Sequence, residues 1–288
     1  MNDSIKRYDL HKDDYSKLHF EVNDGKTYFE KSKIHAAVPH RHSFYQIIWF
    51  KEKGRHYVDY EVVEHEANSL FFINKNQIHY FCTDASNDGF LYHFNDSFIN
   101  KQLKEMMSRF STTIFNEIGK NHITLSETEI KNIGLLTSFI QSEILTKEAS
   151  YKEQVYHYFQ NILLLIERSR AKERTISTKT NEDYKLASDF KKLVMAQIEE
   201  FHSIDEYASQ LGTNAKFLTQ ISKEYLFNTP ANVIKESKLL EAKRMMSNQK
   251  TSIKEIAYAL GFDDPTYFTK YFKKGTGMTP KEFQKLHF

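Results

Sequence analysis

The stretch SIKEIAYALGFDDPTYFTKYFKK, residues 252–274, has the pattern of a helix, a tight turn and a second helix. The same pattern occurs earlier, in SIDEYASQLGTNAKFLTQISK, residues 203–223. Gly261 matches Gly212 at an offset of 49, and after the turn the offset becomes 50, because the second turn holds one extra residue. A repeat whose length change falls in a turn indicates two copies of one supersecondary unit.

Each copy carries its own signals for where its first helix begins and ends. Ser203 with Glu206, and Ser252 with Glu255, have the spacing of a capping box at a helix N-terminus. The glycine just past each first helix suits a residue with positive φ that turns the chain. Both copies therefore predict a helix-turn-helix unit, whose second helix fits the major groove of DNA.

The second helix of each copy is predicted to have two faces. In the later copy Phe262, Phe268, Tyr271 and Phe272 form the packing side, with Tyr267 at its edge. The outer sides carry short hydroxyls, an amide and flexible cations, which suit base edges and phosphates: Lys216, Thr219, Gln220 and Lys223, then Thr266, Thr269, Lys270 and Lys273. A single such face would read as an ordinary solvated surface, but two repeated faces favour DNA binding.

The segment between the two copies, PANVIKESKLLEAKRMMSNQ at 230–249, predicts a continuous helix that would hold them rigidly. If both copies face the same side of a duplex, their second helices would enter major-groove segments about 34 Å apart. Residues 184–288 also hold more Lys and Arg than Asp and Glu, whereas the whole chain of 288 residues has a net charge of only +2. This mild asymmetry agrees with nucleic acid as a partner.

Residues 203–284 resemble the C-terminal domain of the AraC/XylS family of bacterial transcription regulators, on the motifs AKRMM, SIKEIAYALGF, YFTKYFKK and GMTPKEF. The resemblance implies double-stranded promoter DNA as a partner, with RNA polymerase as a further one. It implies base contacts from the outer faces of both second helices: Lys216, Thr219 and Gln220, then Pro265, Thr266, Thr269 and Lys270. Pro265 offers only apolar contact, and Lys238 stands where the family usually has a bidentate Arg.

The N-terminal part of the chain predicts strands followed by helices. Short Phe-, Tyr- and Ile-rich runs over about 34–95 indicate a barrel or sandwich, and apolar residues then recur at helical intervals. The charged stretch ERSRAKERTISTKTNED, 167–183, has the composition of a linker. We therefore expect an α+β protein of two domains: a sensing and dimerisation domain at 1–175 with its barrel at about 34–95 and helices at about 97–168, a linker at 176–184, and an all-α domain of two helix-turn-helix units at 185–288.

The run PHRHSFYQIIWF places His40, His42 and Gln46 on one face of a strand, and His79 follows later. This resembles the cupin barrel pattern of His-x-His, an acid and a later His, which binds a divalent metal in cupin enzymes. Here Gln46 replaces the acid and Asn76 replaces the usual glycine. We expect a cupin-like barrel with a polar ligand pocket and no metal, cofactor or catalytic residue, lined by His40, His42, Gln46, His79 and Tyr92. A bound metal and purely structural histidines are the alternatives.

Taken together, the sequence predicts a cytoplasmic, homodimeric transcription regulator that is not an enzyme and that responds to a small molecule at its barrel. The single cysteine, Cys82, and the absence of an apolar run of membrane length favour the cytosol and no membrane partner. Dimerisation is expected through the helices at about 126–168, where three consecutive leucines, 163–165, widen one apolar surface; deep burial is the alternative. Two other functions stay open: a cupin metalloenzyme with a DNA-binding tail, and a regulator controlled by a protein partner with an inert barrel.

Overall fold

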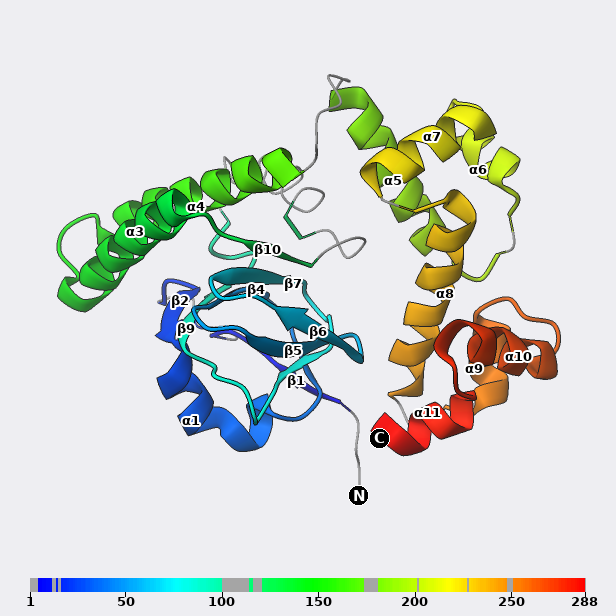
Figure 1. The fold of residues 1–288 in the computed structure, drawn as a ribbon, viewed down its shortest axis with the longest axis horizontal. Coiled ribbons are helices and arrows are strands. Elements are labelled where there is room, and N and C mark those ends of the chain that lie inside the picture. The colour runs from blue at the N-terminus through cyan, green and yellow to red at the C-terminus, as the bar shows by residue number, and fades with distance from the viewer. Residues whose placement is uncertain are drawn as a thin grey trace. The chain divides into compact units, whose positions relative to one another are not determined.

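The structure is a computed structural model, and it describes residues 5–11, 14, 17–99, 114–115, 121–173, 181–200, 202–226, 228–247 and 251–287 (Figure 1). The chain divides into two compact units, Lys6–Ser177 and Thr178–Phe288. Helix α5 begins at Asn181, so residues 181–184 of the expected linker are helical. Each unit is described by itself.

The strands described in the N-terminal unit form two five-stranded sheets. The first sheet has the order β1 (Lys6–Tyr8), β3 (His40–His42), β8 (His79–Phe81), β5 (Gly54–Val58), β6 (Glu61–His65). The second has the order β10 (His122–Thr124), β7 (Ser69–Ile73), β4 (Tyr45–Phe50), β9 (Gly89–Phe94), β2 (Phe20–Asp24). The strands predicted between residues 43 and 94 are confirmed. In the described part of the chain, however, they form two open sheets and not the closed barrel that we expected.

Strand β4 shows how the sequence builds two hydrophobic cores with one sheet between them. Its residues Ile48 and Phe50 are buried in a cluster that also includes Val58 and Phe81 of the first sheet. The alternate residues Ile47 and Trp49 are buried in a second cluster with apolar residues of the helices that follow the sheets. Because successive side chains of a strand point to opposite faces, the unit has three layers: sheet, sheet and helices.

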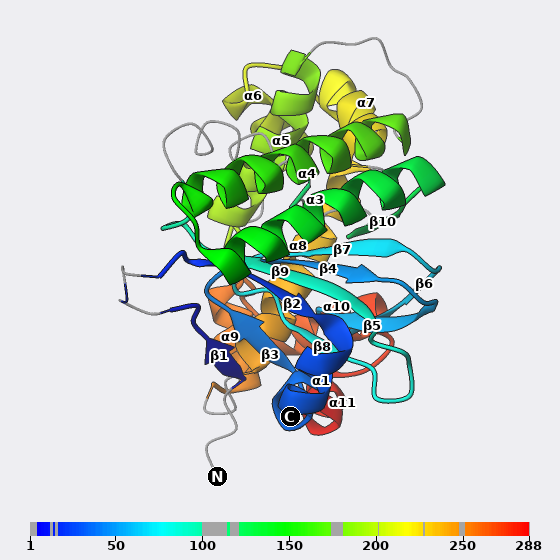
Figure 2. The same ribbon diagram turned by 90° about the vertical axis from the view of Figure 1, so that its left-hand side faces the viewer.

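The helical layer consists of α3 (Glu127–Thr146) and α4 (Tyr151–Glu173), which lie side by side over the second sheet (Figure 2). A capping box of Ser126 and Glu129 starts α3, as the local sequence allows. In α4, Leu163 is fully buried, and its neighbours Leu164 and Leu165 pack partly buried against the same cluster. The wide apolar surface of α4 is therefore used for packing within the unit.

Helix α1 (Gly25–Ala36) was not predicted. It follows β2 directly, and Asp24 caps it by accepting a hydrogen bond from the backbone N–H of Thr27 at 2.8 Å. Residues 34–36, which we expected to open the barrel, are the last turn of this helix. The strands also extend beyond the expected range, because β1 and β2 precede α1 and β10 follows residue 120.

The C-terminal unit contains helices in the part that the structure describes: α5 (Asn181–Ala196), α6 (Ile204–Gln210), α7 (Ala215–Tyr225), α8 (Pro230–Met246), α9 (Ile253–Ala259), α10 (Pro265–Thr276) and α11 (Pro280–His287). The long helix α8 lies between the two repeats, with α6 and α7 near one end and α9 and α10 near the other (Figure 1). The predicted helix at 230–249 is thus confirmed up to Met246; residues 248–250 lie outside the described residues.

In the described parts of the chain, helices of sufficient length lack the apolar character needed to cross a membrane.

Candidate nucleic-acid interface and a buried histidine cluster

The two repeats fold as the same helix-turn-helix unit. Helices α6 and α9 both end before a glycine in the left-handed region, Gly212 with φ of 67° and Gly261 with φ of 79°. In both copies the residue after the glycine donates its backbone N–H to the mid-helix alanine carbonyl at 2.9 Å. The second turn is one residue longer, as the repeat predicted.

Both predicted capping boxes are present. Ser203 and Ser252 each accept a hydrogen bond from the backbone N–H of the glutamate three residues on, at 3.2 Å. Glu206 and Glu255 in return accept from the serine N–H, which lowers the pKa of each carboxyl group. The first helix of each unit is therefore fixed by its own local sequence.

The packing side of α10 is the one that the sequence indicated. Phe268 and Phe272 are buried, and Phe262 lies 5.2 Å from Phe268, centroid to centroid. The Tyr271 hydroxyl donates to a backbone carbonyl of α8 at 3.4 Å. Tyr267 is 58% exposed, at the edge where it was expected. Rings therefore anchor one side of α10 and leave its other side to solvent.

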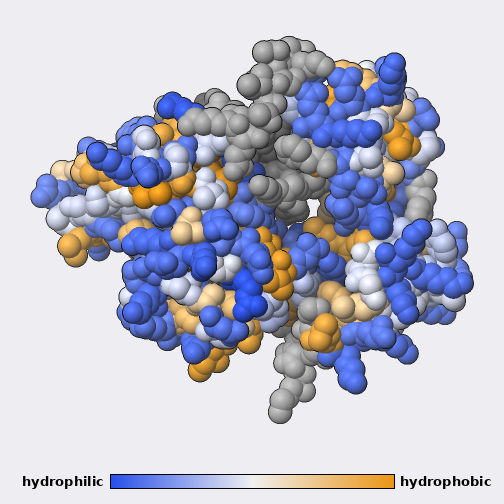
Figure 3. All heavy atoms as spheres, viewed as in Figure 1, coloured by the Kyte–Doolittle hydropathy of each residue, from blue (hydrophilic) through white to orange (hydrophobic). Residues whose placement is uncertain are grey.

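The outer faces of α7 and α10 carry the candidate DNA-contacting residues. Six of these side chains are exposed: Lys216, Gln220, Lys223, Thr266, Lys270 and Lys273. Three are half-buried: Thr219, Pro265 and Thr269. The Thr269 hydroxyl donates to the Pro265 carbonyl at 2.9 Å, so it has only lone pairs left, which can accept from a base but cannot bond to a phosphate. In the view of Figure 3, hydrophilic atoms predominate over α7 and α10.

The two outer helices differ in charge where they begin. The N-cap of α7 is the neutral Asn214, which accepts from the N–H of Phe217 at 2.9 Å. The N-cap of α10 is Asp264, which accepts from the N–H of Thr266 at 2.8 Å, and this bond lowers the pKa of its carboxyl group. Because a carboxylate repels phosphate, the beginning of α10 is less suited to an anion than the beginning of α7.

Lys238 is not part of either outer face. Its side chain, on α8, is 2% exposed, and its amine donates to the carbonyl of Leu260 at 2.9 Å and to that of Ile198. Burial lowers the pKa of this amine to about 8. At this position, where the resembled family usually has Arg, Lys238 links the ends of helices within the unit.

A family model described as a helix-turn-helix domain matches residues 207–286, the region that holds both units. This match overlaps residues 203–284, the region that resembles the C-terminal domain of the AraC/XylS family. The chain is 31% identical over 84 residues to the uncharacterized HTH-type transcriptional regulator YisR of Bacillus subtilis, an alignment that spans 29% of each chain. It is 19% identical over 252 residues to the transcriptional activator RhaR of Escherichia coli O139:H28, covering 86% of this chain and 87% of RhaR. The chain thus matches less than a third of YisR.

A solved structure of an AraC-type DNA-binding domain protein from Chromobacterium violaceum is 25% identical to this chain. It covers 38% of this chain and 96% of its own, with a TM-score of 0.34.

The N-terminal unit buries a compact group of histidines. His40, His42 and His79, here called the histidine cluster, each place a ring nitrogen within 4.8 Å of the other two. His40 and His79 are directly opposite each other on β3 and β8, and His42 follows on the same face of β3. Three of the expected pocket residues are therefore brought together by the first sheet.

The rings of the histidine cluster are neutral. Burial lowers the pKa of His40 to about 4 and the pKa values of His42 and His79 well below the ordinary range. Neither nitrogen of His42 has a hydrogen-bond partner, nor does Nε2 of His79. A buried polar atom without a hydrogen-bond partner lowers the free energy of unfolding by about 1–3 kcal/mol. Burial of these rings therefore stabilises the unit less than their buried surface alone would indicate.

Gln46, the fourth expected pocket residue, belongs to a row of polar side chains that crosses the second sheet. In the strand register Gln46 lies opposite His93, and His93 lies opposite Glu21. The Gln46 amide nitrogen donates to His93 Nε2 at 2.7 Å, and His93 Nδ1 lies 3.8 Å from a Glu21 carboxylate oxygen. The interaction with His93 lowers the pKa of the Glu21 carboxyl group. His93 in turn lies 6.3 Å from His42, with the two rings stacked.

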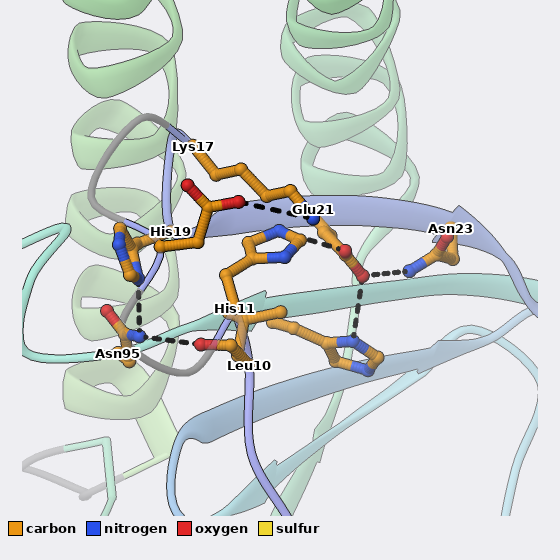
Figure 4. Close-up of polar contacts among 9 residues, drawn as sticks. Leu10, His11, Lys17, His19, Glu21, Asn23 and Asn95 are labelled. Carbon is orange, nitrogen blue, oxygen red and sulfur yellow. Dashed lines mark hydrogen bonds and ion pairs between the residues drawn. The ribbon is translucent and has the colours of Figure 1, made fainter.

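Glu21 gathers further partners at the edge of the sheet (Figure 4). One carboxylate oxygen lies 3.1 Å from His11 Nε2, and the other accepts from the Asn23 amide at 3.3 Å. The sequence reasoning missed both Glu21 and His93. A period of two along GFLYHF does place His93 on the face opposite Tyr92, but the strand that it faces follows only from the register.

Tyr92, the fifth expected pocket residue, is not near the histidine cluster. Its side chain is on the other face of β9, in the core between the second sheet and the helices. Its hydroxyl is 2.6 Å from the Thr137 hydroxyl on α3, and burial raises its pKa. His56, unlike Tyr92, lies next to the cluster: its Nε2 is 3.2 Å from His79 Nδ1. The sequence had not singled out His56.

Proposed function

We propose that this chain binds promoter DNA at specific sequences through α7 and α10 and thereby regulates transcription. The observation that carries the proposal is the repeat: two helix-turn-helix units, each with a polar outer helix, at the two ends of one helix, α8. The names of YisR and RhaR describe HTH-type transcriptional regulators. This supports regulation over the alternative of a metalloenzyme with a DNA-binding tail.

The residues of the two outer faces divide by chemistry into those suited to recognise bases and those suited to bind phosphates. Gln220 has the amide that pairs with adenine, and Lys270 has a cation suited to the acceptor edge of guanine. Pro265 offers an apolar contact of the kind that recognises a thymine methyl group. Lys223 and Lys273, one or two turns further along their helices, are placed to bind phosphates, which position the protein without reading sequence.

Selection of bound sequences from random DNA, with the full chain, tests this proposal. We expect one preferred site longer than a single helical turn. Gln220→Ala and Lys270→Ala should each weaken binding to it about 10- to 100-fold and relax the preference at one position, whereas Lys273→Ala should weaken all sequences alike and reduce the salt dependence by about one charge. Lys281→Ala, an exposed lysine on α11, is the matched control. No preferred sequence, or equal losses in the control, would refute DNA reading by these helices.

We infer that the N-terminal unit controls this binding in response to a signal received in the polar interior between its sheets. The buried unpaired nitrogens of the histidine cluster support a site for a small ligand. In a promoter–reporter strain, His42→Phe should abolish the response of the reporter to growth conditions without changing the preferred DNA sequence. A reporter that still responds as in the wild type would favour the alternatives, such as control by a protein partner.

We also infer that two chains associate through the outer side of α3. Leu135, Phe139 and Leu145 are 53%, 42% and 84% exposed on this helix, and hydrophobic atoms are visible along it in Figure 3. Phe139 also contacts Tyr158 of α4, 5.3 Å between centroids. Exposed apolar surface of this kind often marks an interface. Sedimentation should show a dimer that Leu135→Lys with Phe139→Lys converts to a monomer; a wild-type monomer would refute it.

A further inference from the structure

In the histidine cluster a neighbour fixes the tautomer of His40, and nitrogens of His42 and His79 have no partner. His40 Nδ1 lies 2.8 Å from the Val38 carbonyl, which accepts only, so Nδ1 carries the proton and Nε2 holds a lone pair. His79 Nδ1 lies 3.2 Å from His56 Nε2, and Nε2 of His79 has no partner. Neither nitrogen of His42 has a partner. Either one can therefore carry the proton while the other keeps its lone pair.

Gln46 adds an oxygen to this group by the same reasoning. Its amide nitrogen can only donate, so His93 Nε2 accepts and His93 Nδ1 carries the proton that faces Glu21. This chain of bonds orients the amide and leaves Gln46 Oε1 buried without a partner. The N-terminal unit thus buries the grouped ring nitrogens of three imidazoles and, on β4, a carboxamide oxygen without a partner.

We propose that His40, His42 and His79 bind one divalent transition-metal ion through these ring nitrogens, with the Gln46 oxygen as an adjoining fourth donor. Imidazole ligands favour ions from Fe²⁺ to Zn²⁺, whereas Mg²⁺ and Ca²⁺ prefer carboxylates and several oxygens. At metal–nitrogen distances of about 2.0–2.1 Å the ligand atoms of a tetrahedral site lie roughly 3.3 Å apart. The nitrogens, now within 4.8 Å of one another, need only a small inward rotation of the rings.

The surroundings of the cluster also suit a metal. The Val38 carbonyl accepts from the distal ring N–H of His40, and His56 Nε2 lies 3.2 Å from the distal nitrogen of His79. Such partners form the second layer that orients metal-binding imidazoles. Fewer lone pairs would be equally compatible with a hydrogen-bonding ligand. Three lone pairs that converge on one point favour a single cation.

The experiment is a titration of chelator-treated, untagged full-length protein with Co²⁺, in the absence of DNA. We expect one equivalent per chain, with the visible absorption of a four- or five-coordinate ion, retained by elemental analysis after desalting. His42→Phe, which preserves the ring volume, should weaken binding at least tenfold. His65→Phe is the matched control, because His65 is also buried with an unpartnered Nε2 but lies outside the cluster. Gln46→Glu, which adds a carboxylate, should strengthen binding at least tenfold.

The outcomes separate cleanly. Stoichiometric Co²⁺ that is weakened by His42→Phe and not by His65→Phe supports the site. If circular dichroism shows that His42→Phe does not fold, the Gln46→Glu titration decides: tighter binding supports the site, and unchanged binding overturns it. A folded wild-type protein that takes up no Co²⁺, or takes it up equally in all variants, also overturns it. Because no DNA is present, this result is independent of whether the chain binds a promoter.

Discussion

Lys238 in the C-terminal unit and the histidine cluster in the N-terminal unit are buried basic groups with opposite surroundings. The C-terminal unit buries one amine, that of Lys238, and gives it backbone carbonyls from the ends of two other segments. The N-terminal unit buries the histidine cluster and leaves nitrogens of His42 and His79 without partners. A polar group that the fold satisfies supports the fold, whereas one that the fold leaves open is available to something from outside. The bonds of Lys238 therefore support the fold of the C-terminal unit, whereas the histidine cluster is where we propose that the N-terminal unit receives a ligand.

Among the substitutions that test this comparison, Lys238→Ala is expected to change stability the most. It removes a buried side chain and leaves the carbonyls of Leu260 and Ile198 unpaired, so the free energy of unfolding of the C-terminal unit should fall by about 3 kcal/mol. Amide hydrogen exchange in α8 measures this change locally. Lys281→Ala, on the exposed surface of α11, should change it by less than about 0.5 kcal/mol. Equal protection in both variants would show that Lys238 does not link the helices.

The pH dependence of the same unit is the next effect in size. The pKa of Lys238 is about 8 in the folded chain and 10.5 when it is free of the fold. Between these values the unfolded chain holds a proton that the folded chain has released, so stability rises with pH. We expect a gain of about 1–2 kcal/mol between pH 8 and 10, after allowance for solvent screening. Exchange measurements on Lys238→Met should show no such rise; the same rise in that variant would assign it to another group.

The smallest expected effect has the opposite sign. In metal-free protein His42→Phe replaces unpartnered nitrogens with carbon of similar shape, so it should raise the free energy of unfolding of the N-terminal unit by about 1 kcal/mol. Trp49, the single tryptophan of the chain, lies in this unit, and its fluorescence follows the unfolding. His65→Phe should gain less, because His65 Nδ1 bonds to the Glu66 carbonyl at 3.1 Å. A loss of stability in His42→Phe would mean that His42 is satisfied by the fold.

The same contrast explains what the sequence could predict. The helix-turn-helix units were predictable because their signals are local: capping boxes such as Ser203 with Glu206, and Gly212 and Gly261 at the turns. The row of Glu21, His93 and Gln46 was not, because it depends on the register of three strands that are far apart in the chain.

Other differences from the expectation have similar causes. The buried amine of Lys238 donates to carbonyls that lie 40 residues before it and 22 after it in the chain. No local pattern reveals such partners. Tyr92 is one residue from His93, and a shift of one position along a strand moves a side chain to the other core. The division of the strands between two sheets was likewise beyond the pattern, because alternation identifies strands without identifying their partners.

The most direct test of the central claim, sequence-specific DNA binding by the paired units, is genome-wide mapping of bound DNA in the native organism. Wild-type protein would be compared with Thr266→Ala/Lys270→Ala on the outer face of α10 and with the Lys281→Ala control, all at the same cellular level. We expect discrete peaks at promoters for the wild type and the control, and their loss in the double variant. Absence of discrete peaks, or peaks that persist without Thr266 and Lys270, would contradict the account.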